Sequence, residues 1–134
     1  MASRKPETVP VKTEDDVVAV RRIVRQFTLD MKFGLVDQTK IVTAASELAR
    51  NTVLHGGGGQ MTVEWLVSGV RNGIKLTFED TGPGIADIEQ ALVDGYTTKN
   101  GMGLGLSGSK RLMNEFEIQS TPGVGTRVSV IKWK

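Results

Sequence analysis

Glu47 and Asn51 have the residue types and the spacing of a catalytic pair. They are four residues apart in a predicted helix, so they lie within about 40° of each other on one flank, and His55 continues the line. A carboxylate can act as a general base, and an amide oxygen beside it can bind a hard cation such as Mg²⁺. The alternative for such a pair alone is an ordinary exposed helix face.

A second carboxylate, Asp80, ends a predicted strand. Apolar residues alternate over residues 74–78, and the same parity places Asp80 on the buried side of the strand. In the last predicted strand, parity also turns the hydroxyl of Thr126 inward. An acceptor and a hydroxyl that both face inward suit the polar edge of a heterocycle such as adenine. The alternative is that Asp80 only caps the turn before Pro83.

Glycine clusters follow these polar residues, at residues 56–59, 82–84 and 101–108. Clustered glycines mark backbone that approaches a ligand or adopts positive φ, although ordinary loops contain them too. The loop at residues 101–105 precedes a predicted helix, so its amides can form a phosphate site, and Lys99 adds a point charge. Residues 103–108 also match the GxGxxG string of dinucleotide-binding folds, but no predicted strand leads into them.

The elements that must position these residues follow from hydrophobic periodicity. Thr13 and Asp16 predict a capping box, Asp37 predicts the N-cap of the second helix, and Asn72-Gly73 predicts a hairpin turn. The resulting order favours an α+β fold with helices layered on one face of a mainly antiparallel mixed sheet. The predicted elements are a strand at 8–12, helices at 14–32 and 38–54, hairpin strands at 61–67 and 74–78, helices at 86–93 and 104–116, and strands at 117–121 and 126–133.

Composition limits the classes of function. The 134 residues fit one domain, residues 1–134, and 17 basic against 15 acidic residues without long runs argue against nucleic-acid binding. The sequence has no cysteine and one histidine, which argues against disulfides and against thiolate or histidine metal centres. No apolar run approaches the roughly 20 residues that span a bilayer, and the N-terminus does not resemble a signal peptide. We therefore expect a cytoplasmic protein without membrane or nucleic-acid partners.

Three arginines, Arg21, Arg22 and Arg25, lie opposite the apolar stripe of the first predicted helix. Charges at helical spacing are usually a solvated face. The sharper hypothesis is a docking surface for an acidic partner protein.

The order of the motifs is more specific than any single motif. Glu47-x-x-x-Asn51 is followed by Asp80-x-Gly82-x-Gly84, then by Gly101-x-Gly103-x-Gly105, then by Gly125-Thr126. This order resembles the N, G1 and G2 boxes of the GHKL ATPases, which include histidine-kinase catalytic domains, gyrase, Hsp90 and MutL. Within that group the chain is most similar to RsbT-type switch kinases, which are relatives of the SpoIIAB anti-sigma kinases. The closer likeness lies in residues 46–51, 79–85, 110–116 and 131–133.

This resemblance implies a Bergerat fold that binds MgATP. Asp80 would contact the adenine amino group, and Thr126 would help to seat the base. Asn51 would ligate Mg²⁺, Glu47 would be the catalytic base, and His55 would have a supporting role. The lid at residues 95–100 is short compared with the lids of histidine kinases. The other expected nucleotide-binding residues are Gly82, Gly84, Lys99, Gly101, Gly103, Leu104 and Gly105.

The resemblance also implies a function, namely transfer of the γ-phosphoryl of MgATP to a serine or threonine of a STAS-domain protein. Such a kinase would belong to a stress-response or partner-switching module, with a downstream phosphatase or sigma factor as a further candidate partner. The alternative is a non-catalytic binding protein, of the anti-sigma or phosphatase-activating type, that uses nucleotide as a clasp. Glu47 favours the kinase, because a clasp needs no base. A dinucleotide-binding module is the third hypothesis.

Overall fold

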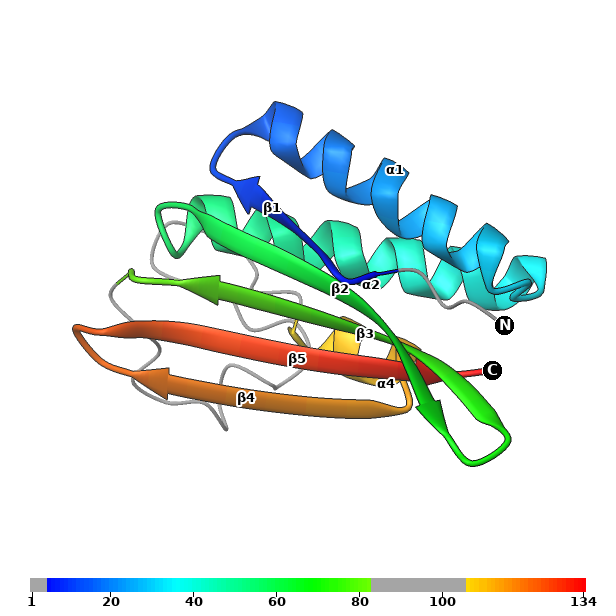
Figure 1. Ribbon diagram of the computed structural model, residues 1–134. Coiled ribbons are helices and arrows are strands. Elements are labelled where there is room, and N and C mark those ends of the chain that lie inside the picture. The colour runs from blue at the N-terminus through cyan, green and yellow to red at the C-terminus, as the bar shows by residue number, and fades with distance from the viewer. Residues whose placement is uncertain (1–4, 83–105) are drawn as a thin grey trace.

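The computed structural model describes residues 5–82 and 106–134, which form a sheet covered by helices (Figure 1). The predicted helix at 86–93 lies outside the described residues. The described elements are β1 (Glu7–Val11), α1 (Glu14–Asp30), α2 (Leu35–Leu54), β2 (Gly59–Ser68), β3 (Arg71–Asp80), α4 (Leu106–Leu112), β4 (Glu115–Thr121) and β5 (Gly125–Trp133).

The sheet has five strands in the order β1-β2-β3-β5-β4. Every pairing between the described strands is antiparallel, so this sheet is antiparallel and not mixed. The three described helices lie over one face of it, as the sequence predicted, and the other face is open in the described part of the chain (Figure 1). The predicted α+β class with helices layered on one face is therefore confirmed.

The start of α1 is the predicted capping box. The hydroxyl of Thr13 accepts a hydrogen bond from the Asp16 amide at 3.2 Å, and the Asp16 carboxylate accepts from the Thr13 amide at 3.2 Å. The same carboxylate also accepts a hydrogen bond from the Lys12 amide at 2.8 Å. Because this amide bonds to the cap, β1 ends at Val11, one residue earlier than predicted. The helix ends at Asp30, two residues before the predicted end, because Lys32 has a left-handed backbone with φ of 62°.

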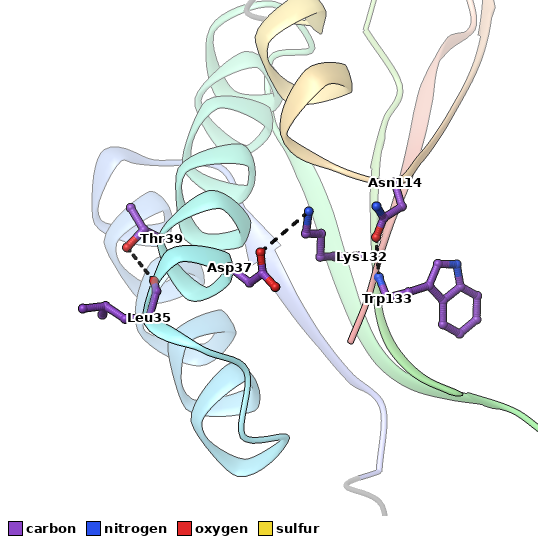
Figure 2. Close-up of polar contacts among 6 residues, drawn as sticks. All are labelled: Leu35, Asp37, Thr39, Asn114, Lys132 and Trp133. Carbon is purple, nitrogen blue, oxygen red and sulfur yellow. Dashed lines mark hydrogen bonds and ion pairs between the residues drawn. The ribbon is translucent and has the colours of Figure 1, made fainter. Parts of the chain in front are cut away.

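The start of α2 differs from the prediction. The helix begins at Leu35, and its N-cap is Gly34, which makes no side-chain cap, so the prediction of Asp37 as N-cap is wrong. Asp37 lies within the first turn, where a carboxylate is favoured by the helix dipole. It points toward β5, with Oδ1 3.9 Å from Nζ of Lys132 (Figure 2). The sheet therefore contributes the partner of this carboxylate.

The residues predicted as the hairpin turn, and the last two residues of the helix predicted at 104–116, belong to strands. Asn72 and Gly73 pair with β2 inside the hairpin, and the turn falls at residues 69–70, where Gly69 has φ of 63°. The helix predicted to reach residue 116 ends at Leu112. The Asn114 amide oxygen accepts a hydrogen bond from the Trp133 amide at 2.7 Å, so the chain there already follows β5 (Figure 2).

The core lies between the helices and the covered face of the sheet. Parity holds along β3, where Ile74 and Leu76 are fully buried and Phe78 is 2% exposed. Because the apolar stripe of α2 packs on these strands, the polar flank of α2 is held near the end of β3. The largest fully buried side chains are Phe27, Ile41, Leu48, Met61, Ile74, Leu76, Val11, Val17, Val20, Val24, Val63 and Val130.

Candidate functional site

A cavity lies between α2, the adjacent ends of β3 and β5, and the first residue of α4. It brings together three of the residues selected from sequence, Asn51, Asp80 and Thr126, which come from three separate elements. Four of its lining residues are apolar and the others offer polar groups or open backbone, as is common in ligand sites. The lining residues are Leu48, Asn51, Thr52, His55, Gly56, Phe78, Asp80, Leu106, Thr126 and Val128.

Strand pairing sets the positions of Asp80 and Thr126. These two residues are direct partners in the β3–β5 ladder, so their side chains lie on the same side of the sheet. On the other side of β5, Thr126 pairs with Ser120, and the two hydroxyl oxygens are 2.8 Å apart. The sequence analysis did not select Ser120, and only the β4–β5 register could have revealed it.

The Asp80 side chain both accepts a hydrogen bond within the turn after β3 and lines the cavity. Its Oδ1 accepts a hydrogen bond from the Gly82 amide at 2.9 Å, so it caps the turn after β3. The same side chain lines the cavity. The capping alternative and the cavity-facing prediction are thus compatible, because one oxygen suffices for the turn.

Glycine permits a close approach between the end of α2 and the end of β3. A Cβ atom at Gly56 would lie 2.3 Å from Cγ of Asp80, and one at Gly82 would lie 2.7 Å from Cα of Gly56. Any side chain at these positions would force the two ends apart or displace the carboxylate. Gly56, which lines the cavity, and Gly82, which packs against it, therefore shape this side of the cavity.

Two buried polar atoms in the cavity lack hydrogen-bond partners among the described residues. They are Nδ2 of Asn51 and Nε2 of His55. Buried polar groups are usually hydrogen-bonded, so unpartnered atoms that line a cavity indicate a site for a polar ligand. Burial lowers the pKa of His55, and the negative charge of Asp80 opposes this shift.

Glu47 does not line this cavity, although helical spacing places it on the flank of Asn51. It lines a second recess between the two long helices, the α1–α2 groove. There its Oε1 lies 3.1 Å from Nη1 of Arg50. Leu35 and Thr39 line the same groove and point away from the Asp37 side of α2 (Figure 2). The groove is lined by Arg21, Arg25, Leu35, Gln38, Thr39, Val42, Thr43, Ser46, Glu47 and Arg50.

Residues 36–134 match the sequence profile of the histidine kinase-, DNA gyrase B- and HSP90-like ATPases. The chain belongs to this ATPase family. The match includes α2 from its second residue and all the strands from β2 onward. The GHKL family predicted from the order of the motifs is therefore confirmed.

Relatives within the family include a kinase and anti-sigma factors. The chain is 46% identical over 125 residues to the serine/threonine-protein kinase RsbT of Bacillus subtilis (strain 168), covering 93% of this chain and 94% of the relative. It is 34% identical over 119 residues to the anti-sigma F factor of Thermoanaerobacter sp. (strain X514), covering 84% and 82% of the two chains. The predicted likeness to RsbT-type kinases and to anti-sigma regulators is confirmed.

Two solved structures share the fold. The RsbU and RsbW domains of a Mycobacterium tuberculosis protein superpose with a TM-score of 0.69 at 18% identity, covering 98% of this chain and 33% of that longer chain. The catalytic domain of the histidine kinase ThkA superposes with a TM-score of 0.55 at 15% identity, covering 94% and 95% of the two chains. At these low identities, the two superpositions support the fold of this ATPase and carry no information on its function.

Several predicted site residues of this ATPase lie outside the described part of the chain and stay predictions. They are Gly84, Lys99, Gly101, Gly103, Leu104 and Gly105. Within residues 5–82 and 106–134, no group of three or more histidine, cysteine or acidic side chains could hold a metal ion. In the same residues no helix combines the length and the apolar character that crossing a bilayer requires. Leu106, which was not selected from sequence, closes one side of the cavity.

We expect the stability of the wild type, relative to His55→Gln, to fall as the pH is lowered. Burial puts the folded pKa of His55 below its ordinary value of 6.5, so the unfolded chain takes up the proton first. The stabilisation is complete above pH 6.5 and is lost as the pH falls through the folded pKa. Urea unfolding of both proteins at about pH 7.5 and about pH 5.5 measures this difference. A wild-type advantage that grew toward acid pH would contradict the assignment.

Proposed function

We propose that this chain is an ATP-dependent serine/threonine protein kinase of a cytoplasmic partner-switching module, and that residues 1–134 act as one kinase domain. Its substrate would be a serine or threonine of a STAS-domain regulatory protein. The observation that carries the proposal is that two residues of α2 line different recesses. Asn51 lines the cavity, and Glu47 lines the α1–α2 groove. The nucleotide-binding residue and the carboxylate that would face a protein partner are thus four residues apart in α2, about 6 Å along the axis.

The cavity suits the base and the metal of MgATP. We infer that Asp80 accepts a hydrogen bond from the adenine amino group and that Thr126 helps to seat the ring. Asn51 fits a Mg²⁺ site because its side chain, which carries an amide oxygen, lines the cavity, and Mg²⁺ commonly takes one or two protein oxygen ligands together with phosphate oxygens. Bound Mg²⁺ would neutralise charge that develops on the phosphates. Residues 101–105 and Lys99 remain our proposed phosphate contacts.

Glu47 supplies the chemistry on the groove side. Its carboxylate would accept the proton of the serine or threonine hydroxyl as the hydroxyl oxygen bonds to the γ-phosphorus. The bond between that phosphorus and the β–γ bridging oxygen would break in the same step and release ADP. The groove is open to a protein segment, since its lining side chains from α1 and α2 are exposed or half-buried, apart from the buried Val42. Arg21 and Arg25 of α1 also line the groove, and their positive charges favour an acidic partner surface.

A second candidate function is a nucleotide-dependent binding protein that holds a sigma factor or activates a phosphatase without transferring phosphate. The likeness to the anti-sigma F factor supports this candidate. Incubation with labelled ATP, Mg²⁺ and candidate STAS proteins separates the two. Label that appears on the STAS protein supports the kinase, whereas nucleotide-dependent retention of a partner without label would support the binding protein.

Asp80→Asn should lose most of its affinity for ATP while it remains folded. The amide is a poorer acceptor for the adenine amino group, and a site built around an acceptor discriminates strongly when that acceptor is changed. Calorimetric titration with ATP measures the affinity, and circular dichroism checks the fold. Near-normal affinity in a folded variant would refute the placement of Asp80 at the base.

Glu47→Ala should retain ATP but lose roughly 10²–10⁴-fold in the rate of phosphotransfer, the usual contribution of one general base. Asn51→Ala should differ, because loss of a metal ligand weakens Mg²⁺-dependent binding and transfer together. Single-turnover transfer and nucleotide binding are measured on both variants. A normal transfer rate in Glu47→Ala would show that another group takes the proton.

Reversal of two groove arginines, Arg21→Glu with Arg25→Glu, should weaken docking of the STAS partner and leave ATP affinity unchanged. Neither side chain lines the cavity, and exposed charges act over about 8 Å at physiological ionic strength. The control is Lys5→Glu with Arg127→Glu, which changes the net charge equally at exposed sites outside the groove. Full pull-down of the partner by the groove variant would mean that docking occurs elsewhere, around residues 96–100.

A further inference from the structure

We propose that Arg50 is a positioning residue for phosphotransfer, which holds the carboxylate of Glu47 in the α1–α2 groove. This inference rests on the proposed function, because it assumes that Glu47 is the base. Arg50 is three residues after Glu47 in α2, and its Nη1 donates a hydrogen bond to Oε1 of Glu47 at 3.1 Å. The second oxygen, Oε2, has no protein partner among the described residues, so it can meet an incoming hydroxyl.

The position of Arg50 in α2 links the two recesses. Arg50 lines the groove with Glu47, and the next residue, Asn51, lines the cavity. The Glu47 side chain has several rotatable bonds and would otherwise sample many orientations on an open helix face. A hydrogen bond to a guanidinium whose own backbone belongs to the same rigid helix restricts those orientations. The carboxylate is thereby held on the groove side, where a protein hydroxyl would enter.

Stability does not account for this contact. The side chains of Arg50 and Glu47 are 41% and 44% exposed, and exposed ion pairs contribute little to folding. Among the described residues that line the groove, Glu47 is the one carboxylate, whereas Arg21, Arg25 and Arg50 carry positive charge. A base in such a basic recess needs a fixed partner, since it could otherwise turn toward either arginine of α1. Arg50 is the partner that the structure shows.

Arg50→Ala should lower kcat on the order of tenfold, the cost of a loosely held reacting group, while KM for ATP and KM for the protein substrate stay unchanged. Arg50→Lys should restore part of the rate, because it keeps the charge but offers no planar fork. In a Glu47→Ala background, the same Arg50→Ala change should have no further effect, since residues that act as a unit are not additive. The melting temperature should not change.

Lys40→Ala is the matched control, because it removes a cation from the same helix at a position that lines neither recess. It should leave kcat and both KM values unchanged. A rise in KM for the protein substrate in Arg50→Ala would make Arg50 a docking residue instead, and a rise in kcat would make the contact inhibitory. Either result, or an undiminished effect in the Glu47→Ala background, overturns the proposal. Normal transfer by Glu47→Ala would instead mean that the proposed base is wrong.

Discussion

The close backbone approach between the end of α2 and the end of β3 is the constraint on which the site depends. A Cβ at Gly56 would lie 2.3 Å from Cγ of Asp80, and one at Gly82 would lie 2.7 Å from Cα of Gly56. The helix end is closed by amides of His55 and Gly56, which both donate to the Asn51 carbonyl. Without this contact, the helix flank that bears Asn51 would lie farther from Asp80, and the cavity would lose one of its walls.

The opposite end of α2 is held by the sheet in a different way. The Lys132 side chain lies on the same side of β5 as the buried residues of that strand and is itself largely buried. Its ammonium group therefore needs a partner. Asp37 in the first turn of α2 is that partner, at 3.9 Å (Figure 2). Glycine at one end and an ion pair at the other therefore fix the axial position and rotation of α2. Fixed rotation matters because one face of this helix must serve the core, another the cavity and a third the groove.

The sequence predicted what depends on local periodicity and missed what depends on partners distant in sequence. The capping box of Thr13 and the inward parity of Asp80 follow from neighbouring residues, and both are found. Asp37 has the residue type of an N-cap, but its partner is a lysine in the last strand. Residues 113–116 have helical periodicity, yet Asn114 bonds to the backbone of β5 instead. Ladder hydrogen bonds from another strand decided those segments, and no local pattern records them.

The separation of Glu47 from Asn51 shows the same limit within one helix. An angular spacing of about 40° predicts two neighbours on one flank, and for the Cα positions this holds. A cavity and a groove are, however, defined by what lies opposite the helix. Asn51 faces the ends of β3 and β5, whereas Glu47 faces α1. There Oε1 of Glu47 lies 3.1 Å from Nη1 of Arg50, which lines the same groove. Because α2 forms the ridge between two recesses, a small angular difference places Asn51 at the cavity and Glu47 in the groove. In the proposed function, Asn51 would then serve the nucleotide and Glu47 the protein substrate.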